Sequence, residues 1–142
     1  MTEKSTEAYL GEHIKKLGFG YMRLPLRDGR FDIGAVNEMV DAFMAGGYSY
    51  FDSAYIYEGS EEAINASLVR RYPRGSFQIA TKLALMLGLT KPEQQLEQFQ
   101  VSLTRLGVDF VDYYLIHGLN AQFTQIADTL DTWSYMREVK AR

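Results

Sequence analysis

The sequence predicts an α/β fold in which parallel strands alternate with helices, as in a (β/α)4 half of a TIM-type (β/α)8 barrel. Short segments rich in β-branched and aromatic residues alternate with longer segments whose apolar residues recur at helical spacing. Such alternation produces a parallel sheet with right-handed crossovers. A complete barrel needs roughly 250 residues, whereas this chain has 142. Four strand–helix units therefore make either an open sheet or an apparently truncated half-barrel.

The first strand–helix unit is expected within residues 14–47. The segment IKKLGFGYMRLPL, residues 14–26, is expected to form a strand interrupted by Gly18 and Gly20. Residues 33–47 predict a helix that stops at its final pair of glycines. The apolar face of this helix comprises Val36, Met39, Val40, Phe43 and Met44.

The second unit begins with YSYFDSAYIY, residues 48–57, whose aromatic residues predict a strand that ends at Asp52. Ser60 is expected to cap the following helix. Ile64 and Leu68 share a face of that helix, since residues four apart are neighbours on a helix surface.

The third and fourth units fill the rest of the chain. SFQIATK, residues 76–82, predicts the third strand, and TKPE, residues 90–93, is a capping box that opens a helix ending at Gly107. The apolar face of that helix is Leu96, Phe99, Leu103 and Leu106. VDYYLIH, residues 111–117, predicts the fourth strand, and residues 126–142 predict one last helix. This helix has no terminal glycine, proline or cap, which is typical of a chain cut off inside a larger pattern.

Composition limits the classes of function. Apolar residues are 46% of the chain and charged residues 23%, so one domain over residues 1–142 is expected. The net charge of −3 and the lack of a basic run do not favour nucleic acid binding. The absence of cysteine excludes disulfides, zinc–thiolate sites and cysteine-ligated iron–sulfur clusters. No apolar stretch fits a signal peptide or a membrane span, so a cytoplasmic location is expected.

Ionisable side chains stand at the ends of three successive expected strands. These residues are Asp52, Lys82 and His117, and Tyr57 follows in the loop after Asp52. The carboxyl ends of parallel strands share one rim, where sites of α/β sheets and barrels are built. We therefore expect the four side chains to converge. The polar residues of SEEAI, residues 60–64, and KPEQQLEQ, residues 91–98, are expected to be solvated helix starts.

This set of side chains suits proton delivery to a carbonyl oxygen that gains negative charge. Tyrosine has an ordinary pKa of about 10, and a nearby ammonium such as Lys82 is expected to lower it. A carboxylate, Asp52, would keep the lysine charged and in place. A neutral His117 would donate a hydrogen bond to the substrate oxygen. No metal site is expected, since the other histidine, His13, is far away in the sequence.

Each of the four residues also has a plainer interpretation. Asp52 would cap a turn, and Tyr57, one of ten tyrosines, would pack in the core. Lys82 would end its strand in solvent, and His117 would be a hydrogen-bonded residue of the rim.

Five segments of the chain resemble the aldo-keto reductase family. They are KLGFGYMRLP, YFDSAYIYEGSEEAI, IATKL, LTRLGVDFVDYYLIHGLN and YMREVKAR. The resemblance as a whole extends over almost the whole chain after residue 14. The resemblance implies a (β/α)8 barrel and hydride transfer between NADPH or NADH and an aldehyde or ketone. HGLN, residues 117–120, is similar to a branch whose members often carry an iron–sulfur extension further on.

The resemblance also implies roles for individual residues. It assigns Tyr57 as the proton donor, Lys82 and Asp52 as the pair that tunes it, and His117 as the residue that orients the substrate. Asp52 is further expected near the nicotinamide ribose. The segment expected to contact the cofactor, NADP or NAD, comprises Gly20, Tyr21, Met22 and Arg23.

Two functions of different classes remain open. The first is an NAD(P)H-dependent carbonyl reductase, represented by its N-terminal half and acting on a small carbonyl substrate. The second is a truncated, catalytically inactive half-barrel that only self-assembles. A half-barrel leaves two strand edges and an apolar interior unpaired, so a homodimer through those edges is expected.

Overall fold

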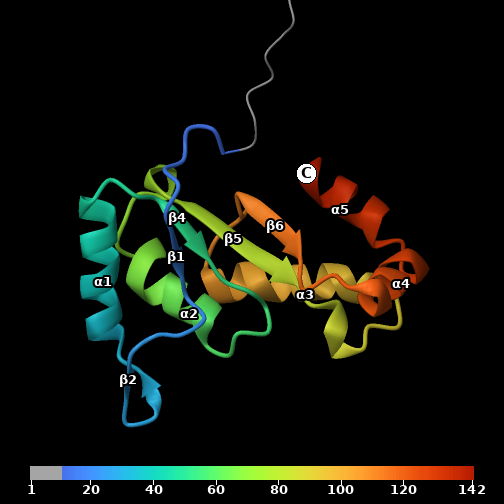
Figure 1. Ribbon diagram of the computed structural model, residues 1–142, viewed down its shortest axis with the longest axis horizontal. Helices are drawn as coiled ribbons and strands as arrows, with labels where there is room; N and C mark the ends of the chain where they lie inside the picture. The colour runs from blue at the N-terminus through green and yellow to red at the C-terminus, as the bar shows by residue number, and fades with distance from the viewer. Residues whose placement is uncertain (1–10) are drawn as a thin grey trace, which may run out of the picture.

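The computed structural model describes residues 11–142 and contains a parallel four-stranded sheet (Figure 1). Its strands are, in order across the sheet, β1 (Gly18–Gly20), β4 (Tyr50–Asp52), β5 (Gln78–Leu83) and β6 (Tyr113–Ile116). Every neighbouring pair is parallel. The order across the sheet follows the order along the chain, as it does in one part of a (β/α)8 barrel. The predicted fold class is therefore confirmed.

Helices follow each strand of this sheet. They are α1 (Ile33–Ala45), α2 (Ser60–Ile64), α3 (Glu93–Leu106), α4 (Ala121–Thr129) and α5 (Thr132–Lys140). A π-helical turn (Asn65–Val69) extends α2, and short 3₁₀ turns cover Arg74–Ser76 and Leu85–Leu87. Figure 1 shows α4 and α5 beyond the β6 edge of the sheet. Within residues 11–142, no helix has both the length and the apolar character needed to cross a membrane.

The main core lies between one face of the sheet and helices α1 and α2. Phe51 of β4 and Ile79 of β5 are register partners, and both are fully buried. The helices contribute Val36, Val40 and Ile64 to this core, and the π-helical turn after α2 contributes Leu68. Successive residues of a strand point to opposite faces, so Asp52 and Lys82 lie on the other face of the sheet. The core thus determines which face carries the candidate site.

A second, smaller core joins β5 to the last two helices. It consists of Leu83, Leu85, Ala127 and Leu130. The expected single helix over residues 126–142 is wrong, because Asp131 adopts a left-handed conformation with φ 49° between α4 and α5. Such a residue cannot continue a right-handed helix, so the chain turns there and Leu130 packs into the core.

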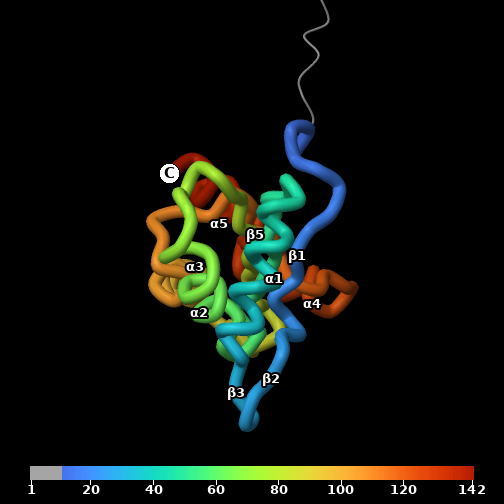
Figure 2. The backbone as a smooth tube through the Cα atoms, turned by 90° about the vertical axis from the view of Figure 1, so that its left-hand side faces the viewer, coloured from blue at the N-terminus to red at the C-terminus, as the bar shows by residue number. Residues whose placement is uncertain are grey.

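A small hairpin between β1 and α1 has no counterpart among the expected elements. Its strands are β2 (Leu26–Arg27) and β3 (Arg30–Phe31), which Figure 2 shows projecting from the molecule. Asp28 and Gly29 form the turn with φ of 51° and 74°, as a two-residue type I′ turn requires. Arg27 pairs with Asp32 at 2.8 Å, and the same carboxylate caps α1.

Two expected helix caps are also wrong. Ser60 is the first residue of α2 rather than its cap, and Gly59 precedes it without a side-chain cap. Thr90 and Glu93 do not form a capping box at α3. Instead, the Gln94 side chain accepts hydrogen bonds from the backbone N–H groups of residues 90 and 91, at 2.8 and 2.9 Å. The expected stop at Gly107 is confirmed, with φ 70° at that glycine.

Candidate active site

An ion pair between Asp52 and Lys82 marks the rim where β4 and β5 end. The Lys82 Nζ lies 2.6 Å from Asp52 Oδ2 and donates a second hydrogen bond of 2.6 Å to the carbonyl oxygen of Ser53. The Lys82 side chain is 14% exposed and that of Asp52 is 35% exposed. The lysine is therefore partly desolvated, and its charge is balanced by one carboxylate.

Tyr57 and His117 complete the cluster. The Lys82 Nζ is 5.3 Å from the centre of the Tyr57 ring. The ring centres of Tyr57 and His117 are 5.5 Å apart, with their planes at 87°. His117 directly follows β6, and its N–H donates to the Leu83 carbonyl at 2.9 Å, which continues the pairing of β5 with β6. The structure thus brings all four predicted residues together.

The electrostatics at Tyr57 differ from the expectation. Burial, followed by the Asp52 carboxylate, raises the pKa of Tyr57 above its ordinary value. The expected net lowering of this pKa is wrong: burial and Asp52 prevail over the Lys82 ammonium, which is bonded to Asp52 and to the Ser53 carbonyl. The Lys82 Nζ lies over the Tyr57 ring, 5.3 Å from its centre. The hydroxyl therefore keeps its proton throughout the neutral pH range.

The surroundings of His117 favour the neutral form of its imidazole ring. Burial, followed by the Lys82 charge, lowers the pKa of His117, against the opposing effect of Asp52. Among residues 11–142, the buried Nδ1 of His117 has no hydrogen-bond partner. Unpaired buried N–H groups are rarer than unpaired acceptors. This favours the tautomer with its proton on Nε2, which leaves one donor for a ligand.

The segment expected to contact a cofactor divides into two parts. Gly20 is the register partner of Asp52, and apart from its chain neighbours no heavy atom lies within 4 Å of the point where a Cβ would stand. Met22 and Arg23 are exposed after β1. The Tyr21 side chain, in contrast, is fully buried, and its hydroxyl is 2.8 Å from Ser67 Oγ. The Tyr21 side chain is therefore not available at the rim. Burial also raises the pKa of its phenol to about 12.

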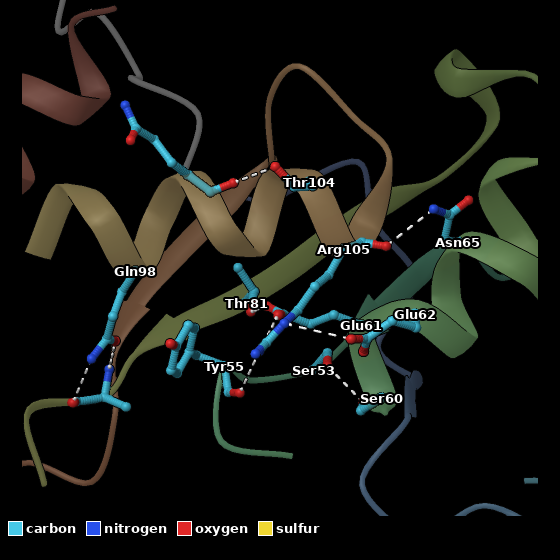
Figure 3. A network of polar contacts seen from close by, with 12 residues as sticks. Ser53, Tyr55, Ser60, Glu61, Glu62, Asn65, Thr81, Gln98, Thr104 and Arg105 are labelled. Atoms are coloured by element: carbon cyan, nitrogen blue, oxygen red, sulfur yellow. Dashed lines mark hydrogen bonds and ion pairs between the residues drawn. The ribbon is translucent and has the colours of Figure 1, made fainter. Parts of the chain in front are cut away.

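Sequence reasoning missed a polar network beside the cluster, shown in Figure 3. Glu61 is 1% exposed and is bonded to Thr81 and Arg105. The expectation that SEEAI is solvated is therefore wrong for Glu61, although its neighbour Glu62 is 54% exposed. KPEQQLEQ is likewise only partly solvated, since Gln95 and Gln98 are buried. No local pattern separates Glu61 from Glu62, because its partners come from distant segments.

Comparison with known proteins identifies relatives. The aldo/keto reductase family matches residues 16–142 of this chain. A curated aldo-keto reductase of Mycolicibacterium smegmatis is 28% identical over 128 residues, which are 90% of this chain and 43% of the relative. An aldehyde reductase of Saccharomyces cerevisiae is 37% identical over 109 residues, covering 75% of this chain and 31% of the relative.

Solved structures agree with these sequence relatives. The crystal structure of an aldo/keto reductase from Brucella melitensis matches with a TM-score of 0.64 and 28% identity, over 87% of this chain and 44% of that one. The chain therefore spans less than half the length of the relatives described here.

Proposed function

Because the chain belongs to the aldo/keto reductase family, we propose that it supports NADPH- or NADH-dependent reduction of an aldehyde or ketone. The observation that carries this proposal is the meeting of Lys82 with Asp52 at 2.6 Å and with the Tyr57 ring at 5.3 Å. His117 stands edge-on to the same ring. The side chains of Lys82, Tyr57 and His117 thus lie together at the rim.

Each of these side chains takes a different part in the proposed reaction. The Tyr57 hydroxyl donates its proton to the carbonyl oxygen as that oxygen gains negative charge. Lys82 stabilises the phenolate that remains, because a nearby cation favours the charged form. Asp52 holds the Lys82 ammonium in place. His117 donates a hydrogen bond through Nε2 to the same carbonyl oxygen and so orients the substrate.

The residues proposed to hold the nicotinamide cofactor are Gly20, Met22, Arg23 and Asp52. They fit such a group, because the space at Gly20 is open and the Arg23 side chain is exposed. A guanidinium is well suited to phosphate oxygens. The reduced nicotinamide would supply a hydride to the carbonyl carbon. We propose NADPH first, with NADH as the alternative.

The direct test is a titration of the purified chain with NADPH and with NADH, followed by fluorescence, and then an assay with a panel of aldehydes and ketones. We expect saturable binding of at least one dinucleotide and oxidation of the cofactor by a carbonyl compound. Arg23→Gln is expected to weaken binding. Arg27→Gln is the matched control, since Arg27 is an exposed arginine paired with Asp32 in the hairpin. Absence of saturable binding would contradict the proposal.

The open edges of the sheet favour a second candidate function. Within residues 11–142, β1 and β6 each have a neighbouring strand on one side only, and Leu115 of β6 is 39% exposed. We propose that two copies pair through these edges, since unpaired strand edges are templates for association. A catalytically inactive half-barrel would form such dimers and bind no dinucleotide.

The cysteine-free composition needs no oxidising compartment, so we also propose the cytoplasm as the location.

A further inference from the structure

The loop that carries Tyr57 is closed at its base by two buried side chains. This loop, residues 53–59, connects β4 to α2. The hydroxyl oxygens of Ser53 and Ser60 are 2.6 Å apart, and neither residue is exposed (Figure 3). Inside the loop, the N–H of Tyr57 donates to the Ala54 carbonyl at 3.0 Å. The two ends of the loop are thereby fixed. In its middle, the Tyr55 N–H donates a long hydrogen bond of 3.4 Å to the Lys82 carbonyl.

Arg105 of α3 supplies a second and shorter contact to the middle of the loop. Its Nη1 donates a hydrogen bond of 3.1 Å to the carbonyl oxygen of Tyr55, two residues before Tyr57. The guanidinium carbon also lies 4.7 Å from the centre of the Tyr55 ring. A charge-assisted hydrogen bond and a cation–π contact thus act on the same residue. Figure 3 shows the Arg105 side chain extending from α3 toward this loop.

Two carboxylates hold the Arg105 side chain: the exposed Glu62, whose Oε1 is 3.5 Å from Arg105 Nε, and the buried Glu61. The Oε2 of Glu61 is 3.4 Å from Arg105 Nη1, and its Oε1 accepts a 2.6 Å hydrogen bond from the Thr81 hydroxyl. A buried carboxylate is costly unless it is paired and hydrogen-bonded, and Glu61 has both kinds of partner. Thr81 immediately precedes Lys82 in β5. The contacts therefore run from the strand of Lys82, through Glu61 and Arg105, to the loop of Tyr57.

We propose that Arg105, oriented by the buried carboxylate of Glu61, is a positioning residue that keeps the Tyr57 ring beside Lys82 and His117. The proposal rests on the proposed function in one respect, namely that Tyr57 is the proton donor. Neither Arg105 nor Glu61 contacts the four clustered side chains through a hydrogen bond within residues 11–142. Their effect passes through the loop backbone.

Amide hydrogen exchange of the full chain, measured by NMR, tests the proposal without relying on activity. Arg105→Met alone would leave Glu61 buried and unpaired, which strongly destabilises a fold. The informative variant is therefore the double substitution Arg105→Met with Glu61→Gln. We expect exchange of the loop amides 55–57 to accelerate about 10- to 100-fold, as the loss of a hydrogen bond to a charged group implies. Exchange in β5 should stay near the wild-type rate.

Arg74→Met provides the matched control. Arg74 resembles Arg105 in its contacts, since it pairs with Asp112 at 2.7 Å, bonds to the Phe77 carbonyl and lies over the ring of Phe110. It precedes β5, however, and so stands at the opposite end of the sheet from Tyr57. Its loss should leave exchange in loop 53–59 unchanged.

The outcomes separate the two proposals. Wild-type exchange in the loop of the folded double variant would overturn the positioning role of Arg105. If that variant does not fold, Arg105→Lys decides by the same criterion, since it keeps the charge beside Glu61 but loses the planar fork. In an active enzyme, the folded double variant should have a lower kcat and nearly the same cofactor affinity as the wild type. A wild-type chain that reduces no carbonyl would contradict the proposed function, while the exchange result would still decide the role of Arg105.

Discussion

The ammonium of Lys82 lies over the ring of Tyr57, 5.3 Å from its centre. Both hydrogen bonds of that ammonium go to the Asp52 carboxylate and the Ser53 carbonyl. The pKa of Tyr57 is therefore set by burial and by Asp52, which both raise it. In the unliganded chain Tyr57 is a protonated group, and the lysine is close enough to stabilise the phenolate once a proton has left.

Removal of the Tyr57 hydroxyl should slow catalysis strongly while sparing cofactor binding. In an active enzyme we expect Tyr57→Phe to lower kcat by about 10²–10⁴-fold, the usual contribution of general acid catalysis. The ring and its packing remain, so cofactor affinity should be nearly unchanged in a fluorescence titration. Tyr72→Phe is the control, because the Tyr72 hydroxyl bonds to Asp41 on α1, away from the cluster. Wild-type turnover in Tyr57→Phe would show that another group gives the proton.

The lowered pKa of His117 predicts that the stability of the fold depends on pH. Burial and Lys82 lower the pKa of His117 below its ordinary 6.5. The unfolded chain therefore binds a proton more readily than the folded chain. The contribution of His117 to the free energy of unfolding is fully present above pH 6.5. It is lost as the pH falls through the pKa that His117 has in the folded chain, which lies below 6.5. Urea denaturation at a series of pH values should show this loss, and His117→Gln should remove it.

The same histidine can be observed directly by NMR titration of its ring. The midpoint for His117 should lie below its ordinary value in the wild-type chain. Lys82→Met should move that midpoint upward, because it removes the positive charge and leaves the Asp52 carboxylate unpaired. Lys15→Met, which removes an ammonium that lies over the distant Tyr48 ring, should not move it. A midpoint insensitive to Lys82→Met would mean that the lysine does not act on His117.

If the chain self-associates through its sheet edges, substitution of an exposed leucine at the β6 edge should weaken the dimer. Leu115 of β6 is the register partner of Lys82 and is 39% exposed. Burying a leucine stabilises a contact by about 1.5–3 kcal/mol, so Leu115→Gln should weaken the dimer by about tenfold or more in sedimentation equilibrium. Leu26→Gln in the hairpin is the control, since Leu26 is 64% exposed and lies off the main sheet. A monomeric wild-type chain at micromolar concentration would contradict the edge-pairing proposal.

The convergence of the site could be predicted from the sequence because it depends on two local facts. Asp52 ends a strand and Lys82 lies near the end of the next one, and parallel strands place such ends on one rim. The face they occupy follows from alternation along the strand. The roles assigned to these residues remain predictions.

Other features could not be predicted in the same way. The burial of Glu61 depends on Arg105, 44 positions later, and no spacing rule reports such a contact. The hairpin did carry a local signal, the Asp28–Gly29 pair typical of a type I′ turn, but its strands of two residues each are too short to show periodicity. The break at Asp131 has only a weak signal, because aspartate adopts positive φ less often than glycine.

The buried side chain of Tyr21 has a consequence for the rim loop that follows β1. Its ring packs among Phe19 and Phe51, and its hydroxyl is bonded to Ser67. The backbone beside Met22 is consequently tethered to the core, while the exposed side chain remains free to meet a ligand. A tethered segment loses little conformational entropy when it is contacted. Tyr21→Phe removes the hydroxyl that bonds to Ser67 and so loosens this segment. Dinucleotide binding should then have a less favourable entropy, which calorimetry can measure.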